Sequence, residues 1–275
     1  MSTTQIHSTA IVDPAAIIGE GVVIGPYCVI EAGVEIGDGC WLQGHVTVCG
    51  STKIGKRNKF YSYGSVGQRS QDLKYKGEPT YLEIGSDNCF REFVTLHRGT
   101  APGSLTKVGD GGNFLAYSHI AHDCIVGNRV IFSNNGTLAG HVEVGDHAII
   151  GGLTAIHQFC RIGRNAITGG CTKIVQDVPP FMIADGNPAL VRGINQIGLE
   201  RNGFSPETIR SIREAYRWIY RSKLNAKESM DKIRETLDQT PEIQHLLDFI
   251  ATSQRGIIRR PVQRHGRAGS DETED

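Results

Sequence analysis

Histidines are concentrated in one part of the sequence, where His119, His122, His141 and His157 lie within 39 residues. A histidine near its unperturbed pKa can remove a proton from a hydroxyl at neutral pH, which contributes typically ~10²–10⁴ in rate. A neighbouring carboxylate can orient the imidazole and stabilise its cation, and a glycine allows a backbone N–H to approach a developing oxyanion. His122, Asp123 and Gly140 are therefore predicted to be general base, orienting carboxylate and oxyanion donor.

A repeat of six residues supplies the elements that would position these side chains. Of the 28 positions spaced six apart from Val12 to Ile174, 24 are Val, Ile, Leu or Phe, whereas this composition would give roughly 11 by chance. A small residue usually lies two positions before the apolar one, and because strand side chains alternate between faces, both point inward. Three six-residue sides make a coil of 18 residues, which predicts a triangular prism of short parallel strands.

The positions of the cysteines and glycines within the repeat add to this interpretation. Four of the seven cysteines fall in the small inward column and are interpreted as core residues: Cys28, Cys40, Cys124 and Cys160. The chain has no CxxC pair, so neither a disulfide framework nor a zinc site is predicted. Glycine often follows the apolar residue, and we expect it to relieve the turn, where φ can be positive.

Regular coils would stack residues that are 18 apart in the sequence. The register is unbroken from Val108 to Ile174, and stacked strands lie about 4.8 Å apart. Three neighbouring columns are then expected: Ala121, Ala139 and His157; His122, Gly140 and Gln158; Asp123, His141 and Phe159. The spacing predicts that the histidines, Asp123, Gly140 and Gln158 form one outward patch about 10 Å tall.

Two segments depart from the repeat and keep its register, which predicts loops leaving a corner of the prism at about residues 68–83 and 98–107. We expect the β-helix to span residues 1–186 and a helical domain to span 187–260. Within that domain, Ser205 and Pro206 are typical of a helix start, and further helices are expected near 226–237 and 241–253. The polar tail, 261–275, is predicted to be disordered.

The composition excludes several classes of function. The chain carries 29 basic and 29 acidic residues, a balance that gives no support for nucleic-acid binding. No apolar stretch reaches the 18 or so residues of a membrane span, and the first residues do not resemble a signal peptide. We therefore expect a cytoplasmic protein.

Six short motifs together resemble the UDP-N-acetylglucosamine O-acyltransferase family. The motifs are Gln71–Tyr75 (QDLKY), Thr95–Thr100 (TLHRGT), His119–Cys124 (HIAHDC), Leu138–His141 (LAGH), Ala155–Cys160 (AIHQFC) and Gln176–Pro180 (QDVPP). The resemblance runs from about residue 6 to Ile258. It implies a left-handed parallel β-helix followed by a small helical domain.

The resemblance also implies an activity. Members transfer an (R)-3-hydroxyacyl chain from acyl carrier protein to the glucosamine 3-hydroxyl of UDP-N-acetylglucosamine, the first step of lipid A biosynthesis. The acyl donor is carried on the phosphopantetheine of the carrier protein, and no other cofactor or metal is implied. The family forms homotrimers with active sites between the prisms.

The resemblance assigns roles to individual residues. His122 would be the base, Asp123 its orienting partner and Gly140 the oxyanion donor. The remaining predicted site residues are Gln71, Asp72 and Lys74 for the sugar nucleotide; His119, His141, His157 and Gln158 for the sugar and acyl pocket; Asn195 and Arg201 for the nucleotide of an adjacent subunit; and Gly170, stacked on Gly152, for acyl-chain length. Ile197 and Asn202 depart from the family pattern, which affects the details of nucleotide binding.

Alternatives remain open from the residues alone. Histidines at these spacings can meet around zinc, and γ-class carbonic anhydrases use this fold with histidines shared between subunits. The related UDP-3-O-acylglucosamine N-acyltransferase normally carries a domain before its repeats, whereas here the repeat begins by Val12. The acceptor could also be the 3-amino analogue of the sugar nucleotide.

Overall fold

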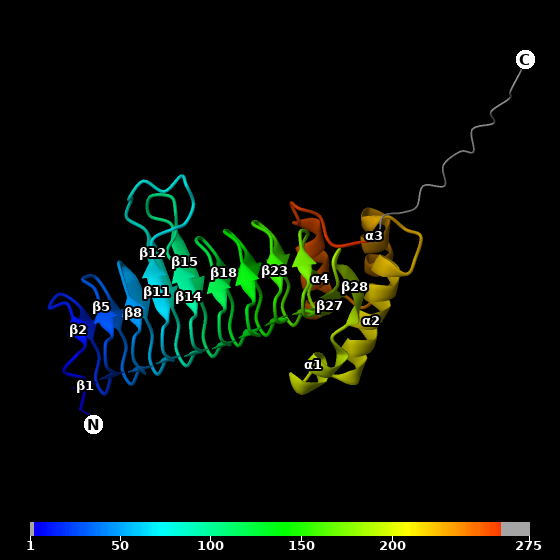
Figure 1. The fold of residues 1–275 in the computed structure, drawn as a ribbon. Helices are drawn as coiled ribbons and strands as arrows, with labels where there is room; N and C mark the ends of the chain where they lie inside the picture. The colour runs from blue at the N-terminus through cyan, green and yellow to red at the C-terminus, as the bar shows by residue number, and fades with distance from the viewer. Residues whose placement is uncertain (1–2, 260–275) are drawn as a thin grey trace, which may run out of the picture.

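The computed structural model describes residues 3–259, and the predicted tail at 261–275 lies outside them. The main body is a left-handed parallel β-helix whose three faces are sheets (Figure 1). The first sheet contains β1 (Gln5–Ile6), β4 (Val23–Ile24), β7 (Trp41–Leu42), β10 (Lys59–Phe60), β13 (Cys89–Phe90), β16 (Asn113–Phe114), β19 (Ile131–Phe132), β22 (Ile149–Ile150), β25 (Ile167–Thr168), β27 (Met182–Asp185) and β28 (Leu190–Ile194).

The other two sheets complete each triangular coil. The second contains β2 (Ile11–Val12), β5 (Val29–Ile30), β8 (Thr47–Val48), β11 (Ser65–Gln68), β14 (Thr95–His97), β17 (His119–Ile120), β20 (Thr137–Leu138), β23 (Ala155–Ile156) and β26 (Lys173–Ile174). The third contains β3 (Ile17–Ile18), β6 (Glu35–Ile36), β9 (Thr52–Ile54), β12 (Tyr81–Ile84), β15 (Leu105–Val108), β18 (Ile125–Val126), β21 (Glu143–Val144) and β24 (Arg161–Ile162).

The apolar column of the repeat fills the axis of the prism, as predicted. Phe60, Phe90, Phe114 and Phe132 are fully buried and their rings stack in sequence, with centroids 4.7–5.1 Å apart. Burial of each such side chain contributes about 1.5–3 kcal/mol. The four cysteines of the small column are also fully buried, which confirms their interpretation as core residues.

The glycines that follow the apolar residue serve a different purpose from the one expected. Positive φ occurs elsewhere in each coil, mostly at residues with side chains such as Tyr63 (φ 66°) and Arg57 (φ 56°). A Cβ on Gly109 would instead lie 2.7 Å from the carbonyl oxygen of Gly127 in the next coil. The expectation of a relieved turn is wrong here, because glycine is required by the close approach of stacked backbones.

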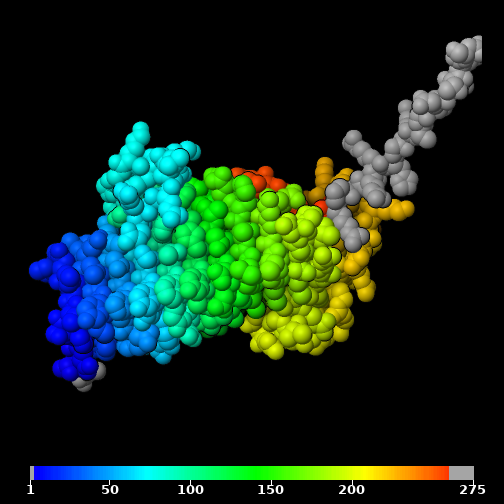
Figure 2. Space-filling view, viewed as in Figure 1, coloured from blue at the N-terminus to red at the C-terminus, as the bar shows by residue number. Residues whose placement is uncertain are grey.

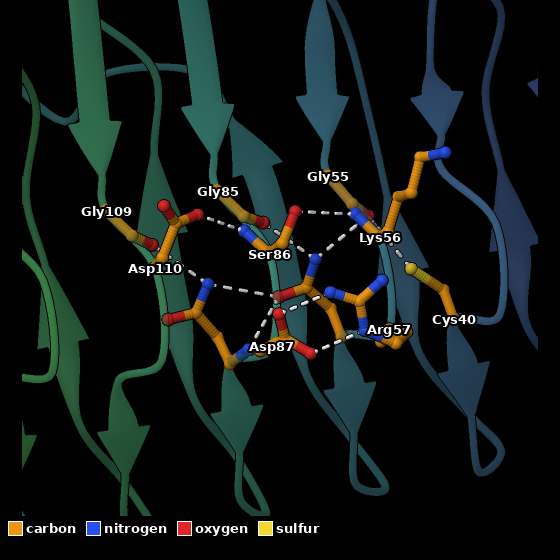
Figure 3. Close-up of polar contacts among 11 residues, drawn as sticks. Cys40, Gly55, Lys56, Arg57, Gly85, Ser86, Asp87, Gly109 and Asp110 are labelled. Carbon is orange, nitrogen blue, oxygen red and sulfur yellow. Dashed lines mark hydrogen bonds and ion pairs between the residues drawn. The ribbon is translucent and has the colours of Figure 1, made fainter.

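Side-chain oxygens connect successive coils at one corner (Figure 3). The Ser86 N–H donates to Asp110 Oδ1 at 2.6 Å, and the Lys56 N–H donates to Ser86 Oγ at 3.0 Å. Arg57 donates two hydrogen bonds to the Asp87 carboxylate. The first two contacts satisfy backbone donors that would otherwise be unpaired where the chain turns.

The two loops leave the same corner of the prism, between the second and third sheets (Figures 1 and 2). The first connects β11, which ends at Gln68, to β12, which begins at Tyr81; the second connects β14, which ends at His97, to β15, which begins at Leu105. Val66 still pairs with Leu96, and Leu96 with Ile120, so both insertions preserve the register, as predicted.

The chain leaves the β-helix through a short antiparallel pair, β27 and β28, and the predicted boundary near residue 186 falls between these strands. The helices that follow are α1 (Gln196–Arg201), α2 (Pro206–Tyr220), α3 (Ala226–Thr236) and α4 (Pro241–Ala251). They lie at the C-terminal end of the prism (Figure 1). Ser205 caps α2 as predicted, whereas α1 was not foreseen. No helix within residues 3–259 is long and apolar enough to cross a membrane.

Asp177 connects the prism to α4. Its buried carboxylate accepts hydrogen bonds from Arg161 Nε at 3.0 Å and from Ser253 Oγ at 2.7 Å, and Arg161 also donates to the Phe249 carbonyl at 2.7 Å. Asp177→Ala would leave Arg161 without its charge partner, so we expect the free energy of unfolding to fall by about 3 kcal/mol. Chemical denaturation measures this change.

A matched control is available on the surface of α3. Asp231 is half-exposed and pairs with Arg234 at 3.0 Å, and exposed pairs contribute at most about 1 kcal/mol. If Asp177→Ala and Asp231→Ala lower the free energy of unfolding by the same amount, Asp177 does not stabilise the packing of the helical domain against the prism.

Candidate active site

His122 lies at the corner between β17 and β18, where the second and third sheets meet. Its Nδ1 is 2.8 Å from Asp123 Oδ2, and its Nε2 is 4.0 Å from Asp72 Oδ2 on the first loop. The patch was expected on an outward face, but the His122 side chain is only 11% exposed, because it lies between these two carboxylates. With Nδ1 bonded to Asp123, Nε2 is the nitrogen that can exchange a proton with a substrate.

Asp123 is held from several directions. Its N–H donates to Thr106 Oγ1 at 2.7 Å, and its carboxylate accepts the Thr100 N–H at 3.1 Å. Burial raises the pKa of Asp123, but the hydrogen bonds with His122 and Thr100 and the charge of His141 outweigh burial and lower the pKa to about 2. The carboxylate therefore stays ionised at neutral pH and can stabilise an imidazolium at His122.

Gly140 lies directly against the His122 ring from the next coil. A Cβ on Gly140 would be 2.5 Å from His122 Nε2, so a side chain here would displace the imidazole. Gly140 is buried, and its N–H donates no hydrogen bond to any group within residues 3–259. A buried, unpaired N–H in a residue that packs against the His122 ring is suited to stabilising an oxyanion.

The other predicted histidines extend this cluster along the prism. His141 stacks on Phe159 with ring centroids 4.7 Å apart, which confirms the predicted column, and its Nε2 is 3.6 Å from Asp123 Oδ2. His119 is bonded through Nδ1 to Thr95 Oγ1 at 2.7 Å, and burial together with the charge of His122 lowers its pKa. The rings of His141 and His122 are in edge contact, with centroids 5.2 Å apart.

His157 and Gln158 lie one coil further and are both exposed. The Nδ1 of His157 is 3.1 Å from the Gln158 carbonyl oxygen, and neither side chain bonds to His122 or Asp123 in the described part of the chain. On the first loop, Gln71 and Lys74 are also exposed, while the Asp72 carboxylate accepts the Lys74 N–H at 2.9 Å. Of the three predicted loop residues, only Asp72 approaches the base.

The cluster has the donor set of a metal site. One atom each from His122, Asp123 and His141 lie within 4.8 Å of one another, and imidazole with carboxylate suits zinc. The same atoms also serve the hydrogen-bonded arrangement described above, so their geometry alone does not distinguish the two chemistries.

Comparison with known proteins shows the family to which the chain belongs. A family model described as UDP-N-acetylglucosamine O-acyltransferase, domain 2, matches residues 177–258. LpxA from Acinetobacter baumannii is 50% identical, with a TM-score of 0.89 over 92% of this chain and 99% of that chain. The chain belongs to the UDP-N-acetylglucosamine acyltransferase family.

Further relatives agree with this assignment. The UDP-N-acetylglucosamine acyltransferase of Francisella novicida is 38% identical with a TM-score of 0.90, covering 94% of this chain and 95% of that one. LpxA from Bacteroides fragilis, also a UDP-N-acetylglucosamine acyltransferase, is 39% identical with a TM-score of 0.91, covering 93% and 100%. The protein is therefore an acyltransferase, and the carbonic anhydrase and N-acyltransferase alternatives are disfavoured.

One polar residue of this acyltransferase was not singled out as a site residue from the sequence. His97 is 6% exposed, and its Nδ1 has no hydrogen-bond partner in the described residues. Burial, with the charges of His119 and His122, lowers its pKa to about 4. His97 lines a cavity of about 580 Å³ beneath the first loop, next to Ser70 and Asp72. Its place one coil before His119 was the signal that could have identified it.

The residues predicted for nucleotide binding and chain length lie apart from this cluster. Asn195 is buried and caps α1, accepting the Gly198 N–H at 3.0 Å, whereas Arg201 is exposed at the end of the same helix. Gly152 and Gly170 stack as predicted: a Cβ on Gly170 would have only the Gly152 carbonyl oxygen within 4 Å, at 3.5 Å. The roles of all four residues stay predictions.

Proposed function

We propose that this acyltransferase moves an (R)-3-hydroxyacyl chain from acyl carrier protein to the 3-hydroxyl of UDP-N-acetylglucosamine, the first step of lipid A biosynthesis. The observation that carries the proposal is the arrangement around His122: the Asp123 carboxylate on Nδ1, Gly140 packed against the ring, and Asp72 of the first loop 4.0 Å from Nε2. Similarity to proteins described as UDP-N-acetylglucosamine acyltransferases supports the acceptor.

The proposed reaction uses these groups in order. His122 Nε2 takes the proton of the sugar 3-hydroxyl as its oxygen attacks the thioester carbonyl carbon, and the Gly140 N–H donates to the oxyanion. Asp123 stabilises the imidazolium. The intermediate collapses by breaking the carbon–sulfur bond, and the imidazolium returns its proton to the departing phosphopantetheine thiolate. No further cofactor takes part.

The remaining residues would bind substrates. Gln71, Asp72 and Lys74 would contact the sugar nucleotide from the first loop, and His119, His141, His157 and Gln158 would line the sugar and acyl pocket. Asn195 and Arg201 follow β28, and by resemblance to the family they would contact the nucleotide in the site of an adjacent subunit of a homotrimer. Their separation from His122 within one chain is consistent with that arrangement.

Product analysis tests the proposal. The protein should convert UDP-N-acetylglucosamine and a 3-hydroxyacyl carrier protein to an acylated sugar nucleotide, seen by mass spectrometry and cleaved by mild base as an ester. A 3-deoxy acceptor is the matched control and should give no product, because it lacks the attacking oxygen. Acylation of the 3-deoxy acceptor would contradict the proposal. So would the absence of acylated UDP-N-acetylglucosamine with every donor in a series of graded chain length.

Chain length gives a further test. Two stacked glycines leave an open strip along which an acyl chain can lie, so we expect a long-chain donor. Gly170→Met would occupy the strip, and displacing about four methylenes at about 0.8 kcal/mol each lowers kcat/KM for a long donor roughly a hundredfold. The kcat/KM for short donors should not change.

The control for this test is Gly193→Met. A Cβ on Gly193, in β28, would meet no atom within 4 Å, so chain-length preference should not change. If Gly170→Met prefers the same donor length as the wild type, Gly170 does not contact the acyl chain.

A further inference from the structure

A pair of buried hydroxyls connects the two loops. Ser70 Oγ, on the first loop, and Thr100 Oγ1, on the second, are 2.6 Å apart, and the two residues are 6% and 9% exposed. Elsewhere the loops are joined mainly near their bases, where the Arg98 N–H donates to the Gln68 carbonyl at 2.9 Å. The hydroxyl pair therefore ties the loops together where they approach the active site.

Each of these residues also forms a hydrogen bond with one of the two aspartates beside His122. Ser70 Oγ accepts the Asp72 N–H at 3.1 Å, and the Thr100 N–H donates to the Asp123 carboxylate at 3.1 and 3.3 Å. Asp72 lies on the Nε2 side of His122 and Asp123 on the Nδ1 side. Contacts of Ser70 and Thr100 thus connect the backbone of Asp72 to the carboxylate of Asp123.

We propose that Ser70 and Thr100 are positioning residues that couple the sugar-nucleotide loop to the His122–Asp123 pair. The inference rests on the proposed function, because it assigns the first loop to the acceptor. Removing either hydroxyl leaves the other buried without its partner, which costs more than the loss of an exposed hydrogen bond. The loops can then shift, so the acceptor and the base lose their relative alignment.

Two substitutions remove one hydroxyl each. Thr100→Val keeps the side-chain shape and the backbone N–H that binds Asp123, and Ser70→Ala removes one oxygen. We expect kcat/KM for UDP-N-acetylglucosamine to fall about tenfold in each, with a lower kcat and a higher KM for the acceptor. KM for the acyl donor should not change. Thr100→Ser, which keeps the hydroxyl, should retain most of the activity.

The first loop provides a matched control. Thr80 is fully buried, and its Oγ1 has no hydrogen-bond partner among residues 3–259. Thr80→Val therefore deletes a buried hydroxyl of the same loop without breaking a bond, and its steady-state constants should match the wild type. A role in folding alone would lower the melting temperature and the active fraction without raising the acceptor KM.

The double variant Ser70→Ala/Thr100→Val tests whether the two hydroxyls act together. If they do, kcat/KM of the double variant should be no lower than that of Ser70→Ala alone, because Ser70→Ala already removes the contact that Thr100→Val removes. A double variant whose kcat/KM falls about a hundredfold, as the product of two independent losses, would overturn the inference. Single variants with the same steady-state constants as Thr80→Val would overturn it too.

A binding measurement separates this inference from the proposed function. Titration calorimetry with UDP-N-acetylglucosamine should show about tenfold weaker binding for Ser70→Ala than for Thr80→Val. If the wild type binds the nucleotide and forms no acylated product, the proposed reaction fails while this comparison still decides the inference. Equal affinities in the two variants, or no binding by the wild type, would overturn it.

Discussion

His122→Ala is expected to lower kcat by about 10²–10⁴, because it removes the imidazole that lies between Asp72 and Asp123 and is placed to take the substrate proton. The Nδ1 contact with Asp123 at 2.8 Å and the proximity of Gly140 to Nε2 single out this imidazole among the clustered histidines. The fold should persist, since His122 is not part of the apolar core. Steady-state kinetics with both substrates saturating measures the loss.

The matched control is His147→Ala. His147 lies at a different corner of the prism and is partly exposed, so its loss should leave kcat close to the wild-type value. A His122→Ala variant that is folded and retains more than a third of wild-type kcat would show that another group is the base.

Gly140→Ala is expected to reduce kcat by about 10³ while preserving the fold. The new Cβ would overlap the His122 ring, whose side chain can move, so the imidazole leaves its position and the backbone is not forced apart. Alanine keeps the backbone N–H of residue 140, so the expected loss comes from displacement of the base, whose contribution is typically about 10²–10⁴. Single-turnover kinetics isolates the chemical step.

Gly64→Ala is the matched control, because it adds the same methyl group at a glycine that does not contact His122. Gly64 is also buried at a corner, but its Cβ would find its nearest neighbour at an ordinary 3.6 Å, the Tyr61 carbonyl oxygen. If Gly140→Ala is as active as Gly64→Ala, the close packing of Gly140 against His122 has no role in catalysis.

Much of the site could be predicted because the prism is periodic. The 18-residue spacing alone places Gly140 beside His122 and His141 beside Asp123, and the structure confirms both contacts. The spacing also indicates that His157 and Gln158 belong to the following coil. Columns of this kind follow from strand pairing, which repeats identically from coil to coil.

The role of glycine shows where local reasoning fails. The sequence indicates where glycine recurs, but a conformational explanation and a packing explanation predict the same column. Only the distance from a would-be Cβ on Gly109 to the Gly127 backbone decides between them. That distance depends on how closely two coils stack, which is a property of the assembled prism.

The sequence by itself determined the coil, its core, the places where loops leave the prism and the column containing His122, because each follows from a short-range period that the backbone geometry must satisfy. The tertiary structure decided which carboxylates flank the base, that Ser70 meets Thr100, and that His97 is buried beneath the first loop. The loops have no period, so their positions follow from contacts such as Thr100–Asp123 and Ser70–Thr100, which join residues 23 and 30 apart in the sequence. Such contacts are set by packing and hydrogen bonding after the coils have formed, and no local pattern records them.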